Sequence, residues 1–383
     1  MNARKLSFWV PSGLHAGSVL KNALRASTDA IASNSVPEAG ANGAYEERNA
    51  STPMQATTLE DSLQEASPTP RECGELRRSL LFVPGCDAHK LEGAASTGAD
   101  TLIFDLEDSV ESGSKDRART LVAERLAAGK GESELVVRVN GCNTACFESD
   151  VIEVVAAGAR SLMLPKSSTA TLAHARSYLA VVEQRLSLEC GCLRILGLVE
   201  TANGIAGLSR LLGEPARIDA LCFGNVDFSL DMGLADGDLS TGVVHHARCS
   251  LSIAAAAAGV SAIDGVCVDV RADQAFEDEA RVALSLGFAG KLCIHPAQVA
   301  IANDVFTPSP AQIARAKRVV DAAAAAERSE KGVFALDGTM VDAPVLELHR
   351  RLLERARRAG VLEADASESN DGQRSPMQME APK

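Results

Sequence analysis

Residues 197–233 read GLVETANGIAGLSRLLGEPARIDALCFGNVDFSLDMG, directly after the apolar segment LRIL. Two short apolar runs, ILGLVE and ALCFGNVD, therefore end on Glu200 and Asp227. The 27-residue interval between these carboxylates has room for one helix-containing crossover, the connection that joins neighbouring parallel strands. The stretch predicts two adjacent parallel strands, each with a carboxylate at its carboxyl end.

Six further short runs are apolar and rich in β-branched residues, so they also predict strands. They are RRSLLFVPG, TLIFDLED, ELVVRVNG, SLMLPK, AIDGVCVDV and KLCIHP. Stretches with helical spacing lie between them, such as KDRARTLVAERL and VVHHARCSLSIAAAAAG. Eight strand–helix repeats over roughly 220 residues favour an α/β fold of the (β/α)8 TIM-barrel type. A doubly wound open sheet is the alternative, but its GxGxxG motif does not follow the first strand.

The chain divides into four predicted segments. Residues 76–330 are predicted to form the barrel, and residues 331–360 a C-terminal helical extension. Residues 1–75 and 361–383 have little to bury and are predicted to be disordered.

The first 28 residues form a distinct part of the N-terminal segment. They carry basic residues, several Ser and Ala, and no acidic residue, as a mitochondrial transit peptide does. An ordinary disordered tail is the alternative. We expect a location in the mitochondrial matrix if the segment is a transit peptide, and a cytoplasmic one otherwise.

Composition argues against several classes of partner. The formal net charge is −13 and aromatic residues make up 3% of the chain, whereas a nucleic-acid binder needs a basic face and usually stacking rings. No apolar stretch approaches the roughly 20 residues of a membrane span. The 10 cysteines lack zinc-finger spacing and are expected to be reduced thiols. Small molecules are thus the expected partners, with neither nucleic acid nor membrane.

Polar side chains follow most of the predicted strands. In a TIM barrel the carboxyl ends of all eight strands meet at one rim, where catalytic residues lie. The residues expected at this rim are Asp105, Glu107, Asp108, Arg138, Asn140, Lys166, Glu200, Asp227, Asp269 and His295.

Glu200 and Asp227 are the candidate metal ligands, because adjacent strands would let their carboxylates converge on one cation. Mg²⁺ is usually held by two carboxylates, with its other positions left to water and substrate oxygens. The alternative is that these strand-terminal acids only cap the helices that follow them.

Arg138 ends an apolar strand, where an unpaired charge would be costly. Its partner is either the acidic cluster of Asp105, Glu107 and Asp108 or a substrate carboxylate. Alternation places Asp105 and Glu107 on one face, where they could bond Arg138 or metal-bound water, whereas Asp108 also fits a helix cap. Beside Mg²⁺, Arg138 would suit a 2-oxo acid and stabilise developing oxyanion charge.

Lys166 and His295 allow more than one interpretation. Lys166 could form a Schiff base, as in lysine-dependent aldolases, but a metal site beside it would already stabilise an enolate, so we expect an electrostatic role. His295 precedes Pro296 and could equally be a structural residue or a ligand contact.

Eight motifs occur in an order and spacing that resemble the citrate lyase beta-subunit-like family of CoA-ester lyases, which includes malyl-CoA and citramalyl-CoA lyases. They are LRRSLLFVPG, IFDLEDSV with KDRAR, VRVNG, LPK, VETANGI, FGNVDFSLDMG, GKLCIHPAQ and DGTMVDAP. The resemblance spans residues 76–358 and implies a (β/α)8 barrel, commonly a trimer. It also implies Mg²⁺ binding by Glu200 and Asp227 and substrate binding by Arg138.

The resemblance assigns further roles. The family's FVPG segment lies near CoA or substrate, which makes Arg78, Phe82 and Pro84 expected lining residues. Asp342, in DGTMVDAP, matches an aspartate that in relatives reaches a neighbouring subunit's site and is thought to act as acid/base. Related barrel aldolases that act on free acids carry a histidine at the position of Asp108. Its absence here favours a CoA ester over a free acid as the substrate.

The expected function is that of a Mg²⁺-dependent carbon–carbon lyase. It would cleave or form a short 3-hydroxy-dicarboxyl-CoA, such as citramalyl-CoA or malyl-CoA, and yield acetyl-CoA and a 2-oxo acid, pyruvate or glyoxylate. Three alternatives stay open: a citrate lyase beta subunit acting on a carrier-protein thioester, a metal-dependent aldolase acting on free acids, and a catalytically silent barrel scaffold. A homotrimer is the expected assembly.

Overall fold

The structure is a computed structural model. It describes residues 75–129, 131–211, 217–235, 239–327 and 333–363. The predicted transit-like and linker segments up to residue 74, and most of the predicted C-terminal tail, lie outside the described residues.

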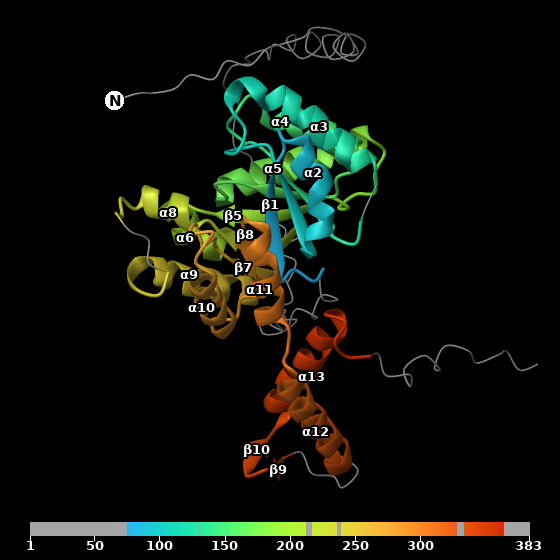
Figure 1. The fold of residues 1–383 in the computed structure, drawn as a ribbon, viewed down its shortest axis with the longest axis vertical. Coiled ribbons are helices and arrows are strands. Elements are labelled where there is room, and N and C mark those ends of the chain that lie inside the picture. Colours follow the sequence, from blue (N-terminus) through green and yellow to red (C-terminus); the bar gives the residue numbers. More distant parts are fainter. Residues whose placement is uncertain (1–74, 130, 212–216, 236–238, 328–332, 364–383) are drawn as a thin grey trace, which may run out of the picture. The chain divides into compact units, whose positions relative to one another are not determined.

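Eight parallel strands close into a barrel, which confirms the predicted fold class (Figure 1). Each strand pairs with the next along the chain, and β1 also pairs with β8, so the sheet has no open edge. The strands are β1 (Ser79–Pro84), β2 (Thr101–Asp105), β3 (Glu134–Arg138), β4 (Ser161–Leu164), β5 (Arg194–Val199), β6 (Ile218–Phe223), β7 (Ser261–Asp264) and β8 (Gly290–Cys293).

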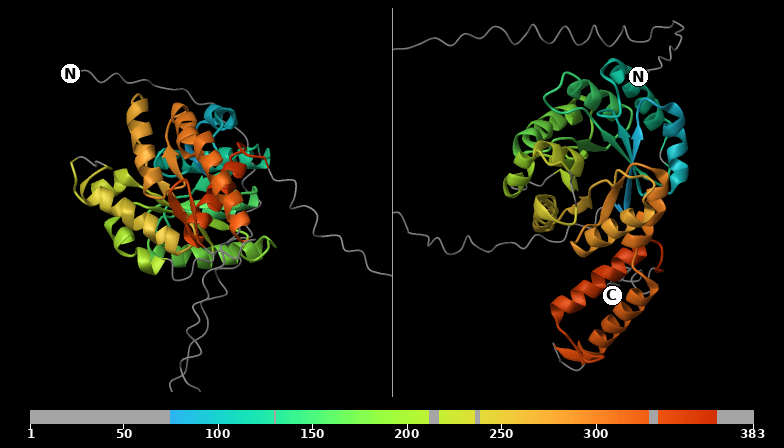
Figure 2. Two further views of the ribbon diagram at one scale, coloured as in Figure 1. Left: turned by 90° about the horizontal axis from the view of Figure 1, so that it is seen from below. Right: turned by 60° about the vertical axis from the view of Figure 1, so that its left-hand side comes forward.

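Helices surround these strands, as Figure 2 shows. They are α2 (Ala88–Gly93), α3 (Lys115–Ala127), α4 (Phe147–Ala156), α5 (Thr169–Arg185), α6 (Ala202–Ala206), α7 (Leu208–Leu211), α8 (Asn225–Asp231), α9 (Gly242–Ala257), α10 (Asp273–Ser285) and α11 (Pro296–Phe306), with single 3₁₀ turns at Ala94–Thr97 and Ser112–Ser114. The two stretches with helical spacing in the sequence correspond to α3 and α9.

The strand wall separates two apolar layers, because successive side chains of a strand point to opposite faces. Leu81 and Val83 face the helices, whereas Leu80 faces the barrel interior. The interior layer consists of Leu80, Ile103, Val136, Met163, Leu196, Leu198, Ala220, Cys222, Ile263 and Leu292. Both faces are therefore buried, which explains why the strands read as continuous apolar runs rather than as alternating ones.

Charged pairs lie at the amino ends of the strands, opposite the rim formed by their carboxyl ends. The guanidinium of Arg77 donates two hydrogen bonds of 2.7 Å to the carboxylate of Glu134. Arg78 donates to Asp100 at 2.7 and 2.9 Å and to the hydroxyl of Thr307 at 2.8 Å. Arg78 precedes β1, a six-residue strand that spans about 20 Å to the rim. The prediction that Arg78 lines the substrate site is therefore wrong.

A second charged cluster lies outside the barrel wall, beneath α9 and α10. The carboxylate of Asp264 accepts from Arg248 Nε at 2.9 Å and from Lys291 Nζ at 2.8 Å, and all three side chains are buried. Asp264 ends β7, so the strand stops earlier than the sequence suggested. Asp269, expected at the rim, lies exposed in the following loop and accepts from the main-chain N of Arg271.

The C-terminal region forms a helical hairpin with its own apolar cluster. It comprises α12 (Pro310–Glu327), the short antiparallel strands β9 (Phe334–Leu336) and β10 (Thr339–Val341), and α13 (Ala343–Arg358). Val319 and Ala323 of α12 pack with Val341 and Leu346. The predicted boundary at residue 330 placed α12 in the barrel, but α12 packs within the extension, because α11 already completes the eighth repeat. In the described part of the chain, no helix is long and apolar enough to cross a bilayer.

Candidate active site

One small cavity at the carboxyl rim brings together residues that are far apart in the sequence. Phe82, Arg138, Glu200 and Asp227 all line it, and its volume is about 70 Å³. Phe82 and Arg138 come from β1 and β3, and Glu200 directly follows β5. Asp227 lies in the first turn of α8, which follows β6. The barrel topology thus produces the convergence that the strand-end positions predicted.

The carboxylate of Glu200 is buried within this cavity wall. Its Oε1 accepts a 2.7 Å hydrogen bond from the main-chain N of Lys166. Burial, together with the nearby charges of Asp227 and Glu107, raises the pKa of Glu200 to about 8, although the hydrogen bond from Lys166 opposes this shift. A buried carboxylate with a raised pKa beside other carboxylates gains stability when a cation joins it.

Gly224 leaves room for the Glu200 side chain beside the start of α8. A Cβ at position 224 would lie 2.6 Å from Glu200 Oε2 and closer still to Glu200 Cβ. The next residue, Asn225, holds the loop after β7, because its amide donates to Val266 O at 3.1 Å and accepts from Val266 N at 2.9 Å. Sequence reasoning missed Asn225, although its place in GNVD, directly after an apolar run, was a usable signal.

Arg138 contacts the acidic cluster, which was one of the two partners considered for it. Its Nε and Nη2 donate to Asp105 at 2.6 and 2.7 Å, and Nη1 lies 3.2 Å from Glu107 Oε2 and 3.4 Å from Asp108 Oδ2. The guanidinium lies over the ring of Phe82, 4.8 Å from its centroid. Burial lowers the pKa of Arg138, but these carboxylates outweigh burial and raise it, so the guanidinium stays charged.

The acidic cluster has two different carboxylate environments. Burial raises the pKa of Asp105, but the hydrogen bonds and charge of Arg138 overcome this and hold it below its usual value. Burial raises the pKa of Glu107, and the neighbouring charges of Asp108 and Asp105 act in the same direction. Asp105 also accepts from the main-chain N of Glu107 and of Ser109, so it fixes the loop that carries the cluster.

Lys166 faces this group of carboxylates from the end of β4. Its Nζ lies 3.6 Å from Glu107 Oε1. Burial lowers the pKa of Lys166, but the charges of Glu107, Glu200, Asp108 and Asp227 outweigh burial and raise it. A protonated amine is no nucleophile, which agrees with the electrostatic role expected for Lys166 rather than a Schiff base.

The charges at the rim suit a divalent cation. Five carboxylates face the two cations Arg138 and Lys166, so acidic side chains outnumber basic ones in this group. Within the described ranges, no group of three or more His, Cys, Asp or Glu side chains is arranged as a metal site. Glu200 and Asp227 are two carboxylates in one cavity wall, and two carboxylates with water and substrate completing the shell are the donor set that Mg²⁺ prefers. That these two residues bind Mg²⁺ stays a prediction.

A larger cavity adjoins the small one. It has a volume of about 400 Å³, and its walls include Phe82, Pro84, His89, Lys90 and His295. Phe82 lines both cavities. His295 has a structural role as well, because its Nδ1 accepts from the main-chain N of Ala297 and caps α11.

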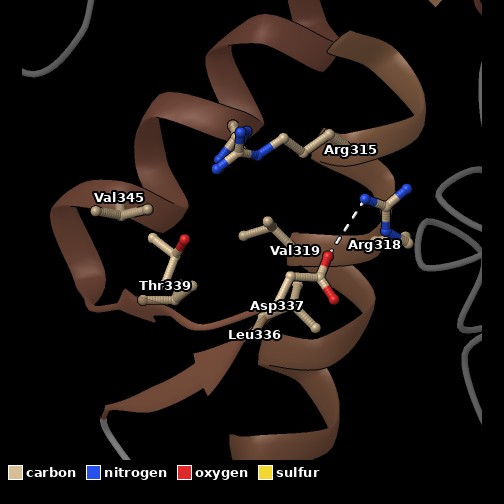
Figure 3. Close-up of a pocket in the computed structure, with 9 residues that line it drawn as sticks. Arg315, Arg318, Val319, Leu336, Asp337, Thr339 and Val345 are labelled. Carbon is tan, nitrogen blue, oxygen red and sulfur yellow. Dashed lines mark hydrogen bonds and ion pairs between the residues drawn. The ribbon is translucent and has the colours of Figure 1, made fainter. Parts of the chain in front are cut away.

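Asp342 does not line either cavity of its own chain. It is the N-cap of α13, and its Oδ1 accepts from the main-chain N of Val345 at 3.1 Å. A separate pocket of about 200 Å³ lies within the hairpin, where Arg318 pairs with Asp337 (Figure 3). That pocket contains none of the residues predicted to act in catalysis.

Carboxylates and an arginine converge at the carboxyl rim of a closed parallel barrel, which is where the catalytic residues of TIM-barrel enzymes lie. The chain belongs to the HpcH/HpaI aldolase/citrate lyase family, whose model matches residues 78–296.

Three curated relatives show the range of activities within the family. The chain is 33% identical to citrate lyase subunit beta of Leuconostoc mesenteroides subsp. cremoris, over 73% of this chain and 93% of the relative. It is 34% identical to a (3S)-malyl-CoA thioesterase of Cereibacter sphaeroides, over 73% and 94%. It is 32% identical to an L-malyl-CoA/beta-methylmalyl-CoA lyase of that species, over 69% and 90%. Membership of this family supports a lyase or a related activity.

A solved structure agrees with this placement. Protein CitE from Mycobacterium tuberculosis, in complex with magnesium, acetoacetate and coenzyme A, matches with a TM-score of 0.60 and 31% identity. The match covers 75% of this chain and 99% of that one.

Proposed function

We propose that this protein is a Mg²⁺-dependent carbon–carbon lyase acting on a short 3-hydroxy-dicarboxyl-CoA of the citramalyl-CoA or malyl-CoA type. One observation carries the proposal: Glu200, Asp227 and Arg138 meet around a small cavity that shares Phe82 with a larger one. The small cavity suits a short 2-oxo acid. The larger one suits a thioester arm, and Lys90 and His89 in its wall could meet an anionic end.

The reaction sets the demands on these residues. The hydroxyl at C3 must lose its proton, the C2–C3 bond must break, and the electron pair must remain on C2 as a thioester enolate. C3 then becomes the carbonyl carbon of the 2-oxo acid, and the enolate takes up a proton to give acetyl-CoA. Cleavage therefore needs a base, an acid, and positive charge beside the oxygen attached to C3.

Arg138 is positioned to supply part of that charge. The bidentate pair with Asp105 fixes the plane of its guanidinium, and the Phe82 ring covers one face. Nη1 is the guanidinium nitrogen that would turn from Glu107 to a substrate oxygen. Glu200 and Asp227 would hold Mg²⁺, which when bound supplies a Lewis acid for the carboxylate and oxo oxygens.

Asp342 completes the proposal as the acid/base, contributed by a neighbouring subunit of a homotrimer. Two observations support this role. Asp342 stands at the start of α13 in a hairpin with its own apolar cluster, and it lines neither rim cavity of its own chain. A second subunit is the simplest source of the missing carboxylate.

The second candidate function is that of a citrate lyase beta subunit, because such a subunit is among the relatives. In that case the substrate would be a thioester on a carrier protein rather than on CoA. The rim chemistry would be the same, and only the larger cavity would have a different occupant.

The experiment supplies the purified full chain and Mg²⁺ with acetyl-CoA and either glyoxylate or pyruvate, and follows the CoA adducts by mass spectrometry. We expect a malyl-CoA or citramalyl-CoA adduct, and cleavage of the same ester in the opposite direction. Arg138→Ala and Glu200→Ala should each lower the rate by at least about a hundredfold. Asp269→Ala is the matched control, because that exposed carboxylate lines neither cavity.

Other products would point elsewhere. Release of CoA with a free hydroxy acid would indicate a thioesterase. Turnover of a carrier-protein thioester alone would indicate a citrate lyase beta subunit. Cleavage that is unaffected by removal of Mg²⁺ would contradict the proposal.

A further inference from the structure

Lys166 has an unusual main-chain conformation for a residue with a side chain. Within the described residues, three non-glycine residues have a positive φ: Lys166 at 48°, Ser187 at 52° and Asp337 at 51°. Left-handed backbone is unfavourable for residues with a Cβ, and β-branched residues tolerate it least. Of the three, Lys166 is the one that contacts the rim carboxylates.

This conformation lets the segment after β4 attach to the end of β5. The main-chain N of Lys166 donates to Glu200 Oε1 at 2.7 Å, and the main-chain N of Ser167 donates to Leu198 O at 2.8 Å. The other carboxylate oxygen, Glu200 Oε2, lies beside Gly224, which lines the small cavity. The hydrogen bond to Oε1 therefore orients the carboxylate so that Oε2 is presented to the cavity.

We propose that Lys166 is a positioning residue that acts through its main chain. Its left-handed backbone directs the N–H to Glu200 and so holds that carboxylate ready for the cation. This inference rests on the proposed function, in which Glu200 is a metal ligand. The side-chain ammonium has a separate task, because it lies 3.6 Å from Glu107 and offsets charge there.

Two substitutions separate the backbone from the side chain. Lys166→Asn removes the ammonium but keeps a residue that readily adopts left-handed backbone. Lys166→Val also removes the ammonium and introduces a β-branched residue that disfavours it. A difference between these variants cannot come from the lost ammonium, because both have lost the same charge.

Isothermal titration of Mg²⁺ into the full chain supplies the first readout. We expect Lys166→Asn to bind Mg²⁺ within about threefold of the unmodified protein, and Lys166→Val to bind at least about tenfold more weakly, as for loss of an outer-shell partner. Ser187→Val is the matched control, because it strains a second positive-φ position that precedes β5 at the other end of the barrel. Equal affinities for the asparagine and valine variants would overturn the inference.

Hydrogen exchange of the Lys166 amide, without metal, supplies the second readout. We expect the amide to be protected in the unmodified protein and to exchange at least about tenfold faster in Glu200→Ala, because its acceptor is gone. Equal exchange in the two proteins would overturn the inference. Protection that depends on Glu200 in a protein that binds no Mg²⁺ would support the positioning contact and sink the proposed function instead.

Discussion

Glu200 illustrates what a single residue contributes at the rim. Its carboxylate is buried beside Asp227 and Glu107, and its pKa is raised to about 8. A bound cation needs the deprotonated form, so a proton and a cation compete for the same group. Without a cation, the protonated form stabilises the fold; this contribution is complete below the unfolded pKa and is lost as the pH rises through 8.

The first prediction concerns the pH dependence of metal binding. We expect the apparent affinity for Mg²⁺ to rise by up to about tenfold per pH unit between about pH 6 and pH 8, and to level off above that range, because Glu200 must lose its proton. Calorimetry in buffers with different ionisation enthalpies would measure the affinity and the proton release together. An affinity that stays constant across this range would show that Glu200 is not the competing group.

The second prediction concerns Gly224. A methyl group there would collide with the Glu200 carboxylate, 2.6 Å from Oε2, so we expect Gly224→Ala to reduce turnover by at least about a hundredfold while the barrel stays folded. Steady-state kinetics and far-UV circular dichroism would separate the two effects. Gly113→Ala is the matched control, because nothing lies within 4 Å of its added Cβ, its φ is outside the left-handed region, and it lines neither rim cavity. Full turnover of Gly224→Ala would contradict the geometry.

Sequence reasoning worked at this scale for residues whose position follows from the end of a strand. The convergence of Glu200, Asp227 and Arg138 on one cavity was predicted because parallel strands in a barrel present their carboxyl ends at one rim, and the roles of these residues stay predictions. Arg78 was misplaced because a motif does not state at which end of its strand a residue lies. Lys166 was identified as a charge, but its left-handed backbone depends on contacts between neighbouring strands that the sequence does not show.

Strand β7 shows how far an element can be predicted. The apolar run was found, but its end was placed at Asp269 instead of Asp264. Asp264 follows an apolar run in the sequence, just as the carboxylates at the rim do. Its partners, however, are Arg248 of α9 and Lys291 of β8. Only the packing of helices on the outer wall distinguishes such a buried structural acid from a catalytic one.

The third prediction tests this buried cluster. Lys291→Met leaves Asp264 and Glu279 with one cation fewer, so we expect the free energy of unfolding to fall by about 3–5 kcal/mol. Chemical denaturation would measure the change. Lys317→Met, on the exposed face of α12, should change it by less than about 0.5 kcal/mol. A loss of less than about 1 kcal/mol for Lys291→Met would show that the methionine repacks without a buried charge left uncompensated.

At the scale of the whole molecule, the barrel was predictable and the boundary of the extension was not. Eight repeats of strand and helix specify the barrel, and the structure confirms it. Helix α12 has a pattern that would equally suit a barrel helix, and its place in the hairpin is decided by contacts with Val341 and Leu346. Such contacts bring together residues that no local pattern relates.

The fourth prediction addresses the assembly. Asp342→Asn keeps an N-cap for α13 and removes the carboxylate, and Arg138→Ala disables the rim. If Asp342 acts in a neighbouring subunit's site, co-expressed variants that are each inactive should regain about a quarter of the unmodified activity when equal amounts assemble at random into trimers. Activity measurements on the purified mixture would test this, and size-exclusion chromatography with light scattering would give the subunit number. Absence of any rescue would place both residues in one subunit's site.

The shared wall between the two rim cavities has a consequence for binding. The Phe82 ring contacts the guanidinium of Arg138 on one side and lines the larger cavity on the other. If an occupant of the larger cavity restricts this ring and so changes the affinity of Arg138 for the short acid, the short acid must change the affinity for that occupant by the same factor. The two products would then not bind independently, and titrating each in the presence of the other should give the same ratio of dissociation constants.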